Sequence, residues 1–491
     1  MGEGNRSEEE AQTSNQHGGW ITFTFIIGTF ACMTLATGGW LSNLIVYLIK
    51  EYNINSIDAT LISNIVSGCI CVFPVVGAVL ADSFFGSFFV ILISTSISLL
   101  AMISLTLTAT IHSVRPQPCD HNNTSITCSS SPSKLQYTIL YSTIILACLG
   151  SGGSRSPFTS LARVLVATTR KRLTRVQVES DEGCYYYGDH QDHRVGMPVV
   201  DGVRLTKSLR CLNPTALITY GDVHLDGTIA KPWRLCEVQE VEDFKTLLKI
   251  FPLWSTCIFL SVPIAIQGSL TVLQALTMDR HHGPNFKIPA GSFAVIIFIS
   301  TTISLTLVDR FLYPIWQKLI GRMPRSLERI GLGHVLNFLS MVVSALVESK
   351  RLKIAHLNHL QGQVEAIVPI SALWLFPQLV LVGMGEAFHF PGQVGLYYQE
   401  FPTSLRSTAT AMISLVIVVV YYLSTGLIDL FHKVTKWLPD DINQGRVDNV
   451  YWTISLIGVI NFGYYLVCAK CYKYQNVEEG GKNINDSITQ H

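Results

Sequence analysis

The stretch that decides the fold reads Leu381-Val-Gly-Met-Gly-Glu-Ala-Phe-His-Phe-Pro-Gly-Gln393 and lies inside a long apolar segment. Glu386 at its centre is the one carboxylate that the hydropathy pattern places well inside an apolar segment. An acidic side chain at membrane depth costs roughly 2.5–3.5 kcal/mol, and chains carry that cost where the group faces a cavity, a partner or a pathway. Pro377 and Pro391 flank Glu386 and predict an interrupted helix, which a membrane tolerates where the helix lines protein or water. The stretch therefore predicts a polar site inside a bundle of membrane helices.

The composition places the whole chain in the same class. Of its 491 residues, 48% are hydrophobic and 14% are charged, whereas soluble domains are about 25% charged. Several apolar runs reach the length expected of membrane-spanning helices. The net charge of +1 argues against nucleic acid or another polyanion as a partner. The polar start of the chain and the long first apolar run argue against a cleavable signal peptide.

The apolar runs predict an all-α membrane protein with ten spans, four before a long polar loop and six after it. The expected spans are 20–49, 59–81, 88–110, 135–150, 251–276, 290–308, 331–347, 367–391, 408–430 and 451–470. They divide the chain into a cytosolic tail (1–18), a shortened N-terminal helical bundle (19–155), a cytosolic linker with an amphipathic helix (156–249), a six-helix C-terminal bundle (250–471) and a second cytosolic tail (472–491).

The basic residues predict the orientation of these spans. Most Lys and Arg residues of the polar segments fall on one side if the N-terminus is cytosolic, as the positive-inside rule requires. Lys350, Arg351 and Lys353 fall on the outside and are the exception. The same orientation places Asn122 and Asn123, two overlapping glycosylation acceptors, in an outer loop.

The twelve cysteines do not form the framework of a secreted domain. Cys119 and Cys128 share the outer loop and are predicted to form a disulfide if that loop is extracellular. Cys468-Ala-Lys-Cys471 has the spacing of a metal-binding pair but lacks a second pair. Asp189-His-Gln-Asp-His193 lies in a turn-rich polar loop, where solvated side chains are the simpler interpretation. We therefore expect neither a metal nor another cofactor.

The segment Gly77-Ala-Val-Leu-Ala-Asp-Ser-Phe-Phe-Gly86 joins the second and third spans. Gly77 permits close helix packing, Asp82 ends the helix, and Gly86 allows a tight turn. This pattern resembles the short loop motif of the major facilitator superfamily, although Ser87 and Phe88 follow where a basic residue is usual. We interpret it as a conformational loop rather than a substrate contact.

Further motifs extend the resemblance to nearly the whole chain. They are Gly18-Gly-Trp20, Val241-Glu-Asp-Phe-Lys-Thr-Leu-Leu-Lys-Ile-Phe-Pro252, Gln274-Ala-Leu-Thr-Met-Asp-Arg280, Arg329-Ile-Gly-Leu-Gly333, Gly383-Met-Gly-Glu-Ala-Phe-His-Phe-Pro-Gly-Gln-Val394, Tyr397-Tyr-Gln-Glu-Phe-Pro402 and Leu405-Arg-Ser-Thr-Ala-Thr-Ala411. Together they resemble the plant nitrate/peptide transporter family, the plant branch of the proton-coupled oligopeptide transporters, and within it the nitrate excretion transporter subgroup. The resemblance implies a major facilitator superfamily fold, nitrate or chloride as the substrate, and the plasma membrane as the location.

The chain departs from the family pattern in its first span. The family usually carries a Glu-x-x-Glu-Arg/Lys motif there, which is linked to proton coupling. The matching positions in this chain are Phe30, Met33 and Thr34, and none of these side chains holds a proton near neutral pH. The resemblance therefore implies anion movement without proton coupling, driven by the membrane potential.

A second departure concerns the number of spans, because the family has twelve in two halves of six. After Gly152-Gly-Ser-Arg155 the resemblance passes directly to the segment that follows the sixth span of the family, beginning at Ser156. Two helices of the N-terminal bundle are thus expected to be missing, and the loss of an even number preserves the topology of the C-terminal half. This leaves open the alternative of a truncated, non-transporting membrane protein, either a splice form or a decayed copy.

Four further residues complete the predicted substrate pathway around Glu386. His389 and Gln393 follow it at i+3 and i+7, on one face if the helix continues past the proline. Arg155 matches a family Lys that acts as a charge partner or anion contact, although its place beside the junction also suits a cytosolic surface. Gln267 is a weaker candidate, because such residues mostly hydrogen-bond neighbouring helices. The alternative interpretation makes Glu386 a structural pairing residue and packs His389 in an apolar wall.

Enzymatic activity is not predicted. The sequence contains no phosphate-binding glycine-rich lysine loop, no nucleophile elbow and no His/Asp set with the spacing of a membrane metalloenzyme. The leading interpretation is a carrier embedded in the lipid bilayer that moves a small anion by alternating access. No signal in the sequence indicates the oligomeric state.

Overall fold

The computed structural model describes residues 20–80, 86–111, 132–151, 186, 209–218, 235–363, 366–401 and 406–472. Within these residues, eight helices are long and apolar enough to cross a membrane, and one 17-residue apolar helix is shorter. The prediction of a helical membrane protein is therefore confirmed. The count of ten spans stays a prediction, because the 33-residue helix Trp20–Tyr52 is not among the eight. The 17-residue helix extends only about 26 Å, while the hydrocarbon core is about 30 Å thick.

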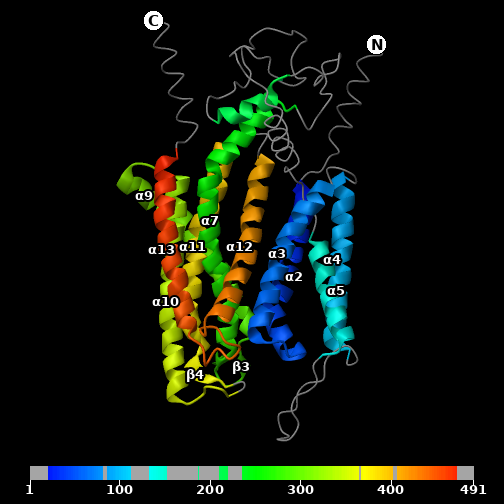
Figure 1. The fold of residues 1–491 in the computed structure, drawn as a ribbon, viewed down its shortest axis with the longest axis vertical. Helices are drawn as coiled ribbons and strands as arrows, with labels where there is room; N and C mark the ends of the chain where they lie inside the picture. The colour runs from blue at the N-terminus through cyan, green and yellow to red at the C-terminus, as the bar shows by residue number, and fades with distance from the viewer. Residues whose placement is uncertain are drawn as a thin grey trace.

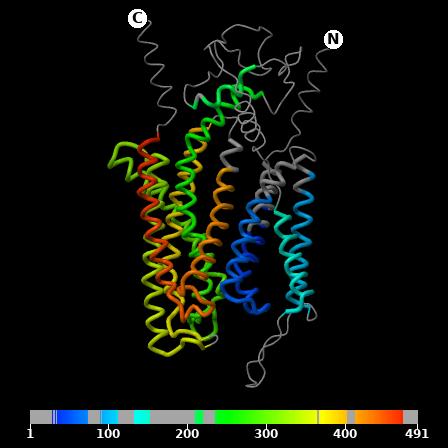
Figure 2. Tube along the Cα trace, in the orientation of Figure 1, coloured from blue at the N-terminus to red at the C-terminus, as the bar shows by residue number. Residues whose placement is uncertain are grey.

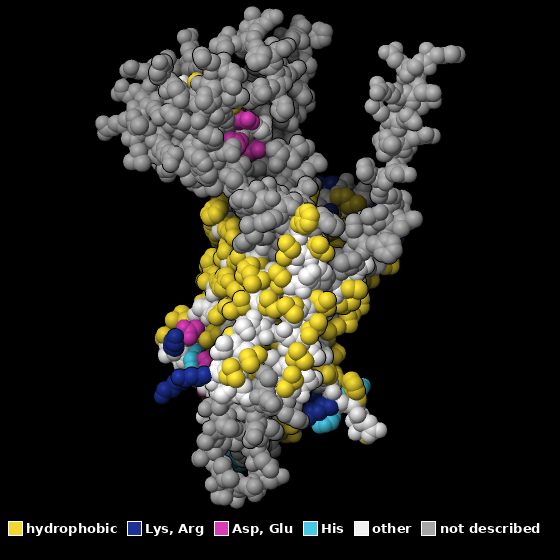
Figure 3. Space-filling model, turned by 90° about the vertical axis from the view of Figure 1, so that its right-hand side faces the viewer, with side chains coloured by type: hydrophobic (Ala, Val, Ile, Leu, Met, Phe, Trp, Pro, Cys, Tyr) yellow, Lys and Arg dark blue, Asp and Glu magenta, His cyan; other side chains and the backbone are white. Residues whose placement is uncertain are grey.

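Four helices form an N-terminal group (Figure 1), namely α2 (Trp20–Tyr52), α3 (Ser56–Leu80), α4 (Gly86–Thr110) and α5 (Lys134–Gly150). α4 packs on α5, and α2 packs on α3. Figure 3 views the molecule from the side of this group and shows hydrophobic side chains over the middle of the face, with Lys and Arg nearer its lower end. Such a belt is the surface expected of helices that contact lipid.

The C-terminal group contains the remaining long helices. They are α7 (Val238–Leu276), α8 (Ala294–Leu307), the π-helical turn η5 (Val308–Leu312), α9 (Tyr313–Ile320), α10 (Ser326–Leu357), α11 (Phe376–Glu400), α12 (Arg406–Val434) and α13 (Val447–Cys471). α8, η5 and α9 follow one another without a break. α7 is the most enclosed candidate span, because it packs against α10, α12 and α13.

Short elements close the end of the molecule where α7 and α10 finish. They are the strands β1 (Met278–Asp279), β2 (His281–His282), β3 (Phe286–Lys287) and β4 (Val368–Ser371), and the 3-10 helices η4 (Ala290–Phe293) and η6 (Ala372–Leu375). β1 pairs with β4 in parallel, and β2 pairs with β3 as a hairpin. We call this end the outer end, and the opposite end the inner end. The 3-10 helix η3 (Arg210–Ala216) packs instead against α7.

Several helices extend beyond the apolar runs that predicted them. α7 begins at Val238, so its first turns lie in the segment assigned to the linker, and the Glu237 carboxylate and the Glu240 side chain cap that start. α10 continues to Leu357 rather than 347. α11 runs through Pro391 to Glu400, so the helix does survive its proline. Hydropathy marks only the apolar part of a helix, whereas backbone hydrogen bonding continues into polar sequence.

The two groups meet mainly along α3 and α12, which lie side by side in Figures 1 and 2. The Tyr422 ring lies against Gly68, where a Cβ atom would come within 3.1 Å of the ring. The Cys69 Sγ atom lies 3.3 Å from the Tyr422 Oη atom. Between α7 and α3, the buried Ser269 hydroxyl donates a 2.8 Å hydrogen bond to the Asn64 Oδ1 atom. The interface therefore combines close packing with buried polar contacts.

Glycines bring α10 and α11 into close contact. A Cβ atom built on Gly333 would lie 2.5 Å from the Cβ atom of His389, and one built on Gly385 would lie 2.5 Å from the Asn337 Oδ1 atom. Small residues at such positions let membrane helices approach, and dispersion then stabilises the contact. Any larger side chain must separate the helices.

We predict that Gly333→Ala destabilises the protein by about 1–3 kcal/mol, the usual cost of overpacking. The matched control is Gly268→Ala on α7, because a Cβ atom there would meet nothing within 4 Å. Thermal unfolding of the purified protein in lipid nanodiscs measures both variants. An unchanged melting temperature for Gly333→Ala would contradict the close-contact account.

Candidate functional site

Glu386 lies on α11, half-buried, and faces α8. Its Oε2 atom lies 3.2 Å from the Thr301 hydroxyl, which also donates a 2.8 Å hydrogen bond to the Ile297 carbonyl oxygen. Gly383, one turn earlier on α11, lets the two helices approach, since a Cβ atom there would come within 2.7 Å of the same carbonyl. Among the described residues, no Lys, Arg or His forms an ion pair with Glu386. The carboxylate is thus held by a single neutral donor.

The surroundings of Glu386 connect it to the N-terminal group. Tyr421 on α12 is close enough to Glu386 to interact with its charge, and it also interacts with Ser67 and Cys71 on α3. Tyr421 therefore stands between the carboxylate and the other group of helices. This arrangement places Glu386 near the interface between the two groups rather than deep within one of them.

His389 and Gln393 lie on α11 as predicted but point elsewhere. Both are almost completely buried, with exposed fractions of 0% and 2%. His389 packs against Gly333 of α10, and Gln393 lies beside Cys257 of α7. The structure thus places these two side chains inside the C-terminal group, whereas Glu386 faces α8.

Gln267 also lies inside the C-terminal group. Its amide nitrogen donates a 2.9 Å hydrogen bond to the Ser344 hydroxyl, and its amide oxygen accepts one of 2.9 Å from the Ser340 hydroxyl. Both serines belong to α10. Gln267 therefore joins α7 to α10, which is the helix-joining arrangement expected of most such residues.

Many of the predicted residues fall where the structure gives no side-chain description. Phe30, Met33 and Thr34 lie within α2, Gly77 lies within α3, and Gly86 begins α4, but their side chains are not described. Arg155, Asp82, Asn122, Asn123, Cys119, Cys128 and the expected amphipathic helix of the linker lie outside the described residues. Their roles stay predictions.

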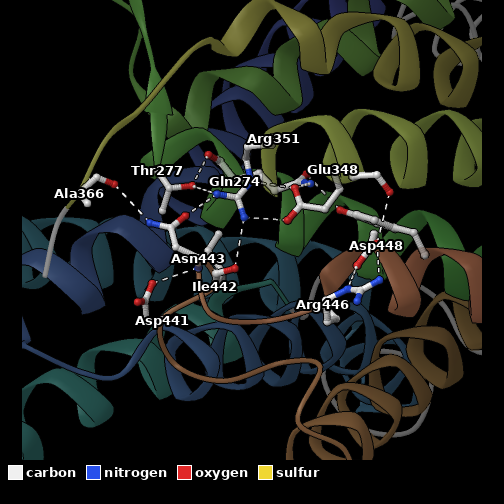
Figure 4. A network of polar contacts seen from close by, with 12 residues as sticks. Gln274, Thr277, Glu348, Arg351, Ala366, Asp441, Ile442, Asn443, Arg446 and Asp448 are labelled. Carbon is white, nitrogen blue, oxygen red and sulfur yellow. Dashed lines mark hydrogen bonds and ion pairs between the residues drawn. The ribbon is translucent and has the colours of Figure 1, made fainter. Parts of the chain in front are cut away.

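A buried ion pair lies at the outer end of the C-terminal group (Figure 4). Glu348 and Arg351 on α10 are both 0% exposed, with an Nη2–Oε1 distance of 2.7 Å. The sequence places Arg351 in a polar segment outside the membrane, and that side of the membrane stays a prediction. The sequence did not predict that Arg351 is buried beside Glu348. Because α10 extends past its apolar run and packs on its neighbours, one face of its last turns is buried together with these charges.

Protein groups satisfy this ion pair completely. The Arg351 Nε and Nη2 atoms donate to Glu348, and the Nη1 atom donates to the Thr277 hydroxyl at 3.1 Å and to the Asn443 Oδ1 atom at 2.5 Å. The remaining N–H donates to the Ile442 carbonyl oxygen at 3.2 Å. All five N–H groups therefore have acceptors, as a buried guanidinium requires.

Gln274 extends the network to two further helices. Its amide nitrogen donates a 2.6 Å hydrogen bond to Glu348, and its oxygen accepts a 3.1 Å hydrogen bond from the Tyr451 hydroxyl of α13. The network thus joins α7, α10, α13 and the loop before α13. The i, i+3 spacing of Glu348 and Arg351 beside an apolar run is the sequence signal that could have indicated it.

Comparison with known proteins identifies what the chain resembles. The POT family model matches residues 154–444. Protein NRT1/ PTR FAMILY 2.7 of Arabidopsis thaliana is 45% identical over 550 aligned positions, which cover 96% of this chain and 95% of the relative. Protein NRT1/ PTR FAMILY 2.6 of the same plant is 44% identical, covering 97% of each chain.

Solved structures show the same fold. A crystal structure described as an auto inhibited POT family peptide transporter has a TM-score of 0.60 at 14% identity, covering 92% of this chain and 97% of that one. The POT family transporter PepTSo has the same TM-score and identity and covers 92% and 98%. At such identities the likeness concerns the fold alone, and it agrees with the predicted major facilitator superfamily architecture.

The alignment lengths reveal a difference from the relatives. The alignment has 550 positions and covers 96% of the 491 residues of this chain, which is about 471 residues. At the other positions, about 80 in number, the relative has a residue and this chain has a gap. Two membrane-spanning helices with their connections need a segment of this size, at about 20 residues a span. The absence of two helices nevertheless stays a prediction, because the alignment length does not place the empty positions.

We predict that Arg351→Met destabilises the protein by about 3–5 kcal/mol, because it leaves the Glu348 carboxylate buried and unpaired. The control is Arg446→Met, whose ion pair with Asp448 is exposed on the arginine side and should be worth about 0–1 kcal/mol. Denaturation in detergent micelles measures both. The double variant Glu348→Met/Arg351→Met should lose less stability than Arg351→Met alone. A larger loss of stability in the double variant would contradict the unpaired-charge explanation.

Proposed function

The chain belongs to the POT family, among the NRT1/PTR transporters, and from this premise we propose that it carries nitrate or another small anion such as chloride across the plasma membrane. The substrate and the location come from the resemblance of its motifs to the nitrate excretion subgroup. Transport would proceed by alternating access, with the two groups of helices moving around a site near the middle of the bilayer.

The observation that carries this proposal is the position of Glu386. Its carboxylate is half-buried at membrane depth and accepts a hydrogen bond only from Thr301 among the described residues. Tyr421 links its surroundings to α3 of the other group. A costly charge at a moving interface is the pattern expected of a transport pathway rather than of a packed core.

The surroundings of Glu386 suit an anion only when the negative charge of the Glu386 carboxylate is offset. The hydroxyl groups of Thr301 and Tyr421 supply neutral donors, and a carboxylate beside them would repel nitrate. A cation such as Arg155 would remove that repulsion. A guanidinium is suited to nitrate, because its planar fork matches planar oxygens. His389, Gln393 and Gln267 would then support the pathway from within the C-terminal group.

We further propose that transport proceeds without proton coupling. Phe30, Met33 and Thr34 occupy the positions at which the family usually carries its proton-coupling motif, and none of them titrates near neutral pH. The membrane potential would then drive the anion, at about 2.3 kcal/mol per charge for each 100 mV.

A truncated, non-transporting membrane protein is the second candidate. The observation in its favour is that about 80 aligned positions in total are filled in a relative and empty in this chain. Helix α4 is also mostly exposed, since only 11% of its apolar part is buried within the molecule. An incomplete N-terminal group could fail to close one side of the pathway.

A flux measurement distinguishes the two candidates. We expect the full chain in proteoliposomes to move labelled nitrate or chloride but not a dipeptide. Glu386→Gln should lower the flux by about 10- to 100-fold, because it removes the charge-assisted contact that would hold a cation such as Arg155 beside the anion. The control is Asp429→Asn, which breaks an exposed pair with Lys433 and should change the flux by less than about twofold. The absence of any flux from correctly folded protein would favour the truncated form.

The pH dependence tests the absence of proton coupling. We expect nitrate flux to follow an imposed membrane potential and to change by less than about twofold between about pH 7.5 and about pH 5.5, because no group in the first span titrates there. Valinomycin and a potassium gradient set the potential at each pH. A steep rise in flux on acidification would contradict this proposal.

A further inference from the structure

Some buried polar residues of the C-terminal group are fully satisfied by protein partners, whereas others are not. Arg351 and Gln267 have protein partners for their polar atoms. At the inner end, five almost completely buried side chains have polar atoms without a partner among the described residues. They are His334, Asn337, His389, Gln393 and Tyr397, which we call the inner polar seam.

The seam is continuous across α10 and α11. His389, Gln393 and Tyr397 lie four residues apart on one face of α11. His334 and Asn337 lie on α10, close to Gly333. A Cβ atom built on Gly333 would lie 2.5 Å from the Cβ atom of His389. A Cβ atom built on Gly385 would lie 2.5 Å from the Asn337 Oδ1 atom, so the glycine makes room for this amide between the two helices. The seam is therefore a single cluster at a close helix contact.

The seam offers both donors and acceptors. The unpartnered atoms include the amide nitrogens of Asn337 and Gln393, the Tyr397 hydroxyl and the Asn337 amide oxygen. The Nδ1 atom of His389 lies 3.3 Å from the Gly385 carbonyl oxygen and therefore carries the hydrogen, so its Nε2 atom is an acceptor. No Asp, Glu, Lys or Arg is a member of the seam. A neutral ligand that both donates and accepts hydrogen bonds fits this set.

We propose that the inner polar seam binds a short file of buried water molecules that enters from the inner end of α11. Water is the smallest ligand with both functions, and buried water typically makes about three hydrogen bonds to otherwise unsatisfied polar groups. The side chains from His389 onward lead toward Glu400, the last residue of α11, over about 17 Å at 1.5 Å per residue. There the Glu400 carboxylate accepts a 2.8 Å hydrogen bond from the Tyr472 hydroxyl.

This water site differs from the site around Glu386 and does not rest on the proposed transport function. Glu386 faces α8, whereas the seam faces α10 and α7. A native cysteine reports on the seam, because Cys257 on α7 interacts with both Gln393 and Tyr397. Cys257 is only 3% exposed, so a reagent reaches it only through a hydrated path.

The test treats the full chain in lipid nanodiscs with 2-aminoethyl methanethiosulfonate and follows each cysteine by mass spectrometry. Cys148 is the buried reference, since it is 4% exposed and packs among apolar residues of α3 and α5. Cys471 at the exposed end of α13 is the accessible reference. We expect Cys257 to react at least about tenfold faster than Cys148, because thiol modification requires access to water. An equal or slower rate would overturn the proposal.

Two variants test whether the path runs through the seam. Gln393→Leu should slow the reaction of Cys257 about tenfold by filling the path with an apolar group. Val394→Ala on the exposed side of the same helix is the matched control and should leave the rate unchanged. A fast Cys257 that Gln393→Leu does not slow would show that the reagent arrives by another route, and would also overturn the proposal. If Gln393→Leu does not fold, the relative rates of Cys257 and Cys148 in the unsubstituted chain still support or overturn the water site.

Discussion

The buried ion pair between Glu348 and Arg351 holds the outer end of the C-terminal group together. Ionised groups in a low-dielectric interior require complete hydrogen bonding, because the desolvation of each charge is costly. Arg351 meets this requirement only if α7, α10 and the loop before α13 all converge on it. Gln274 and Tyr451 then bring α13 into the same network. The requirement thus fixes four segments relative to one another.

Buried polar groups elsewhere in the molecule differ in how completely protein hydrogen-bond partners satisfy them. Gln267 is satisfied by two serines of α10, which adds a second polar connection between α7 and α10. Glu386 has one neutral donor and lies near the interface with the N-terminal group. The inner polar seam has polar atoms that no described residue satisfies. The buried polar groups of the C-terminal group are therefore satisfied to different degrees.

The network around Arg351 is consistent with a carrier. Alternating access needs rigid groups of helices that move against each other, and a network such as that of Arg351 makes one group move as a body. The interface with the N-terminal group depends instead on the packing of α3 against α12 and on isolated contacts such as the Ser269–Asn64 hydrogen bond. Among the described residues, the N-terminal group contributes four helices, α2 to α5.

The sequence by itself determined the membrane class, the family and the approximate place of the helices, because long apolar runs and closely spaced motifs are local signals. It also identified Glu386, since a lone carboxylate in an apolar run is visible without any structure. Only the tertiary structure decided which way the side chains of α11 point, and it separated Glu386 from His389 and Gln393. It alone revealed that Arg351 is buried, because burial depends on helices distant in sequence that pack around the end of α10. Direction and burial are properties of contacts between elements, and hydropathy along one segment does not contain them.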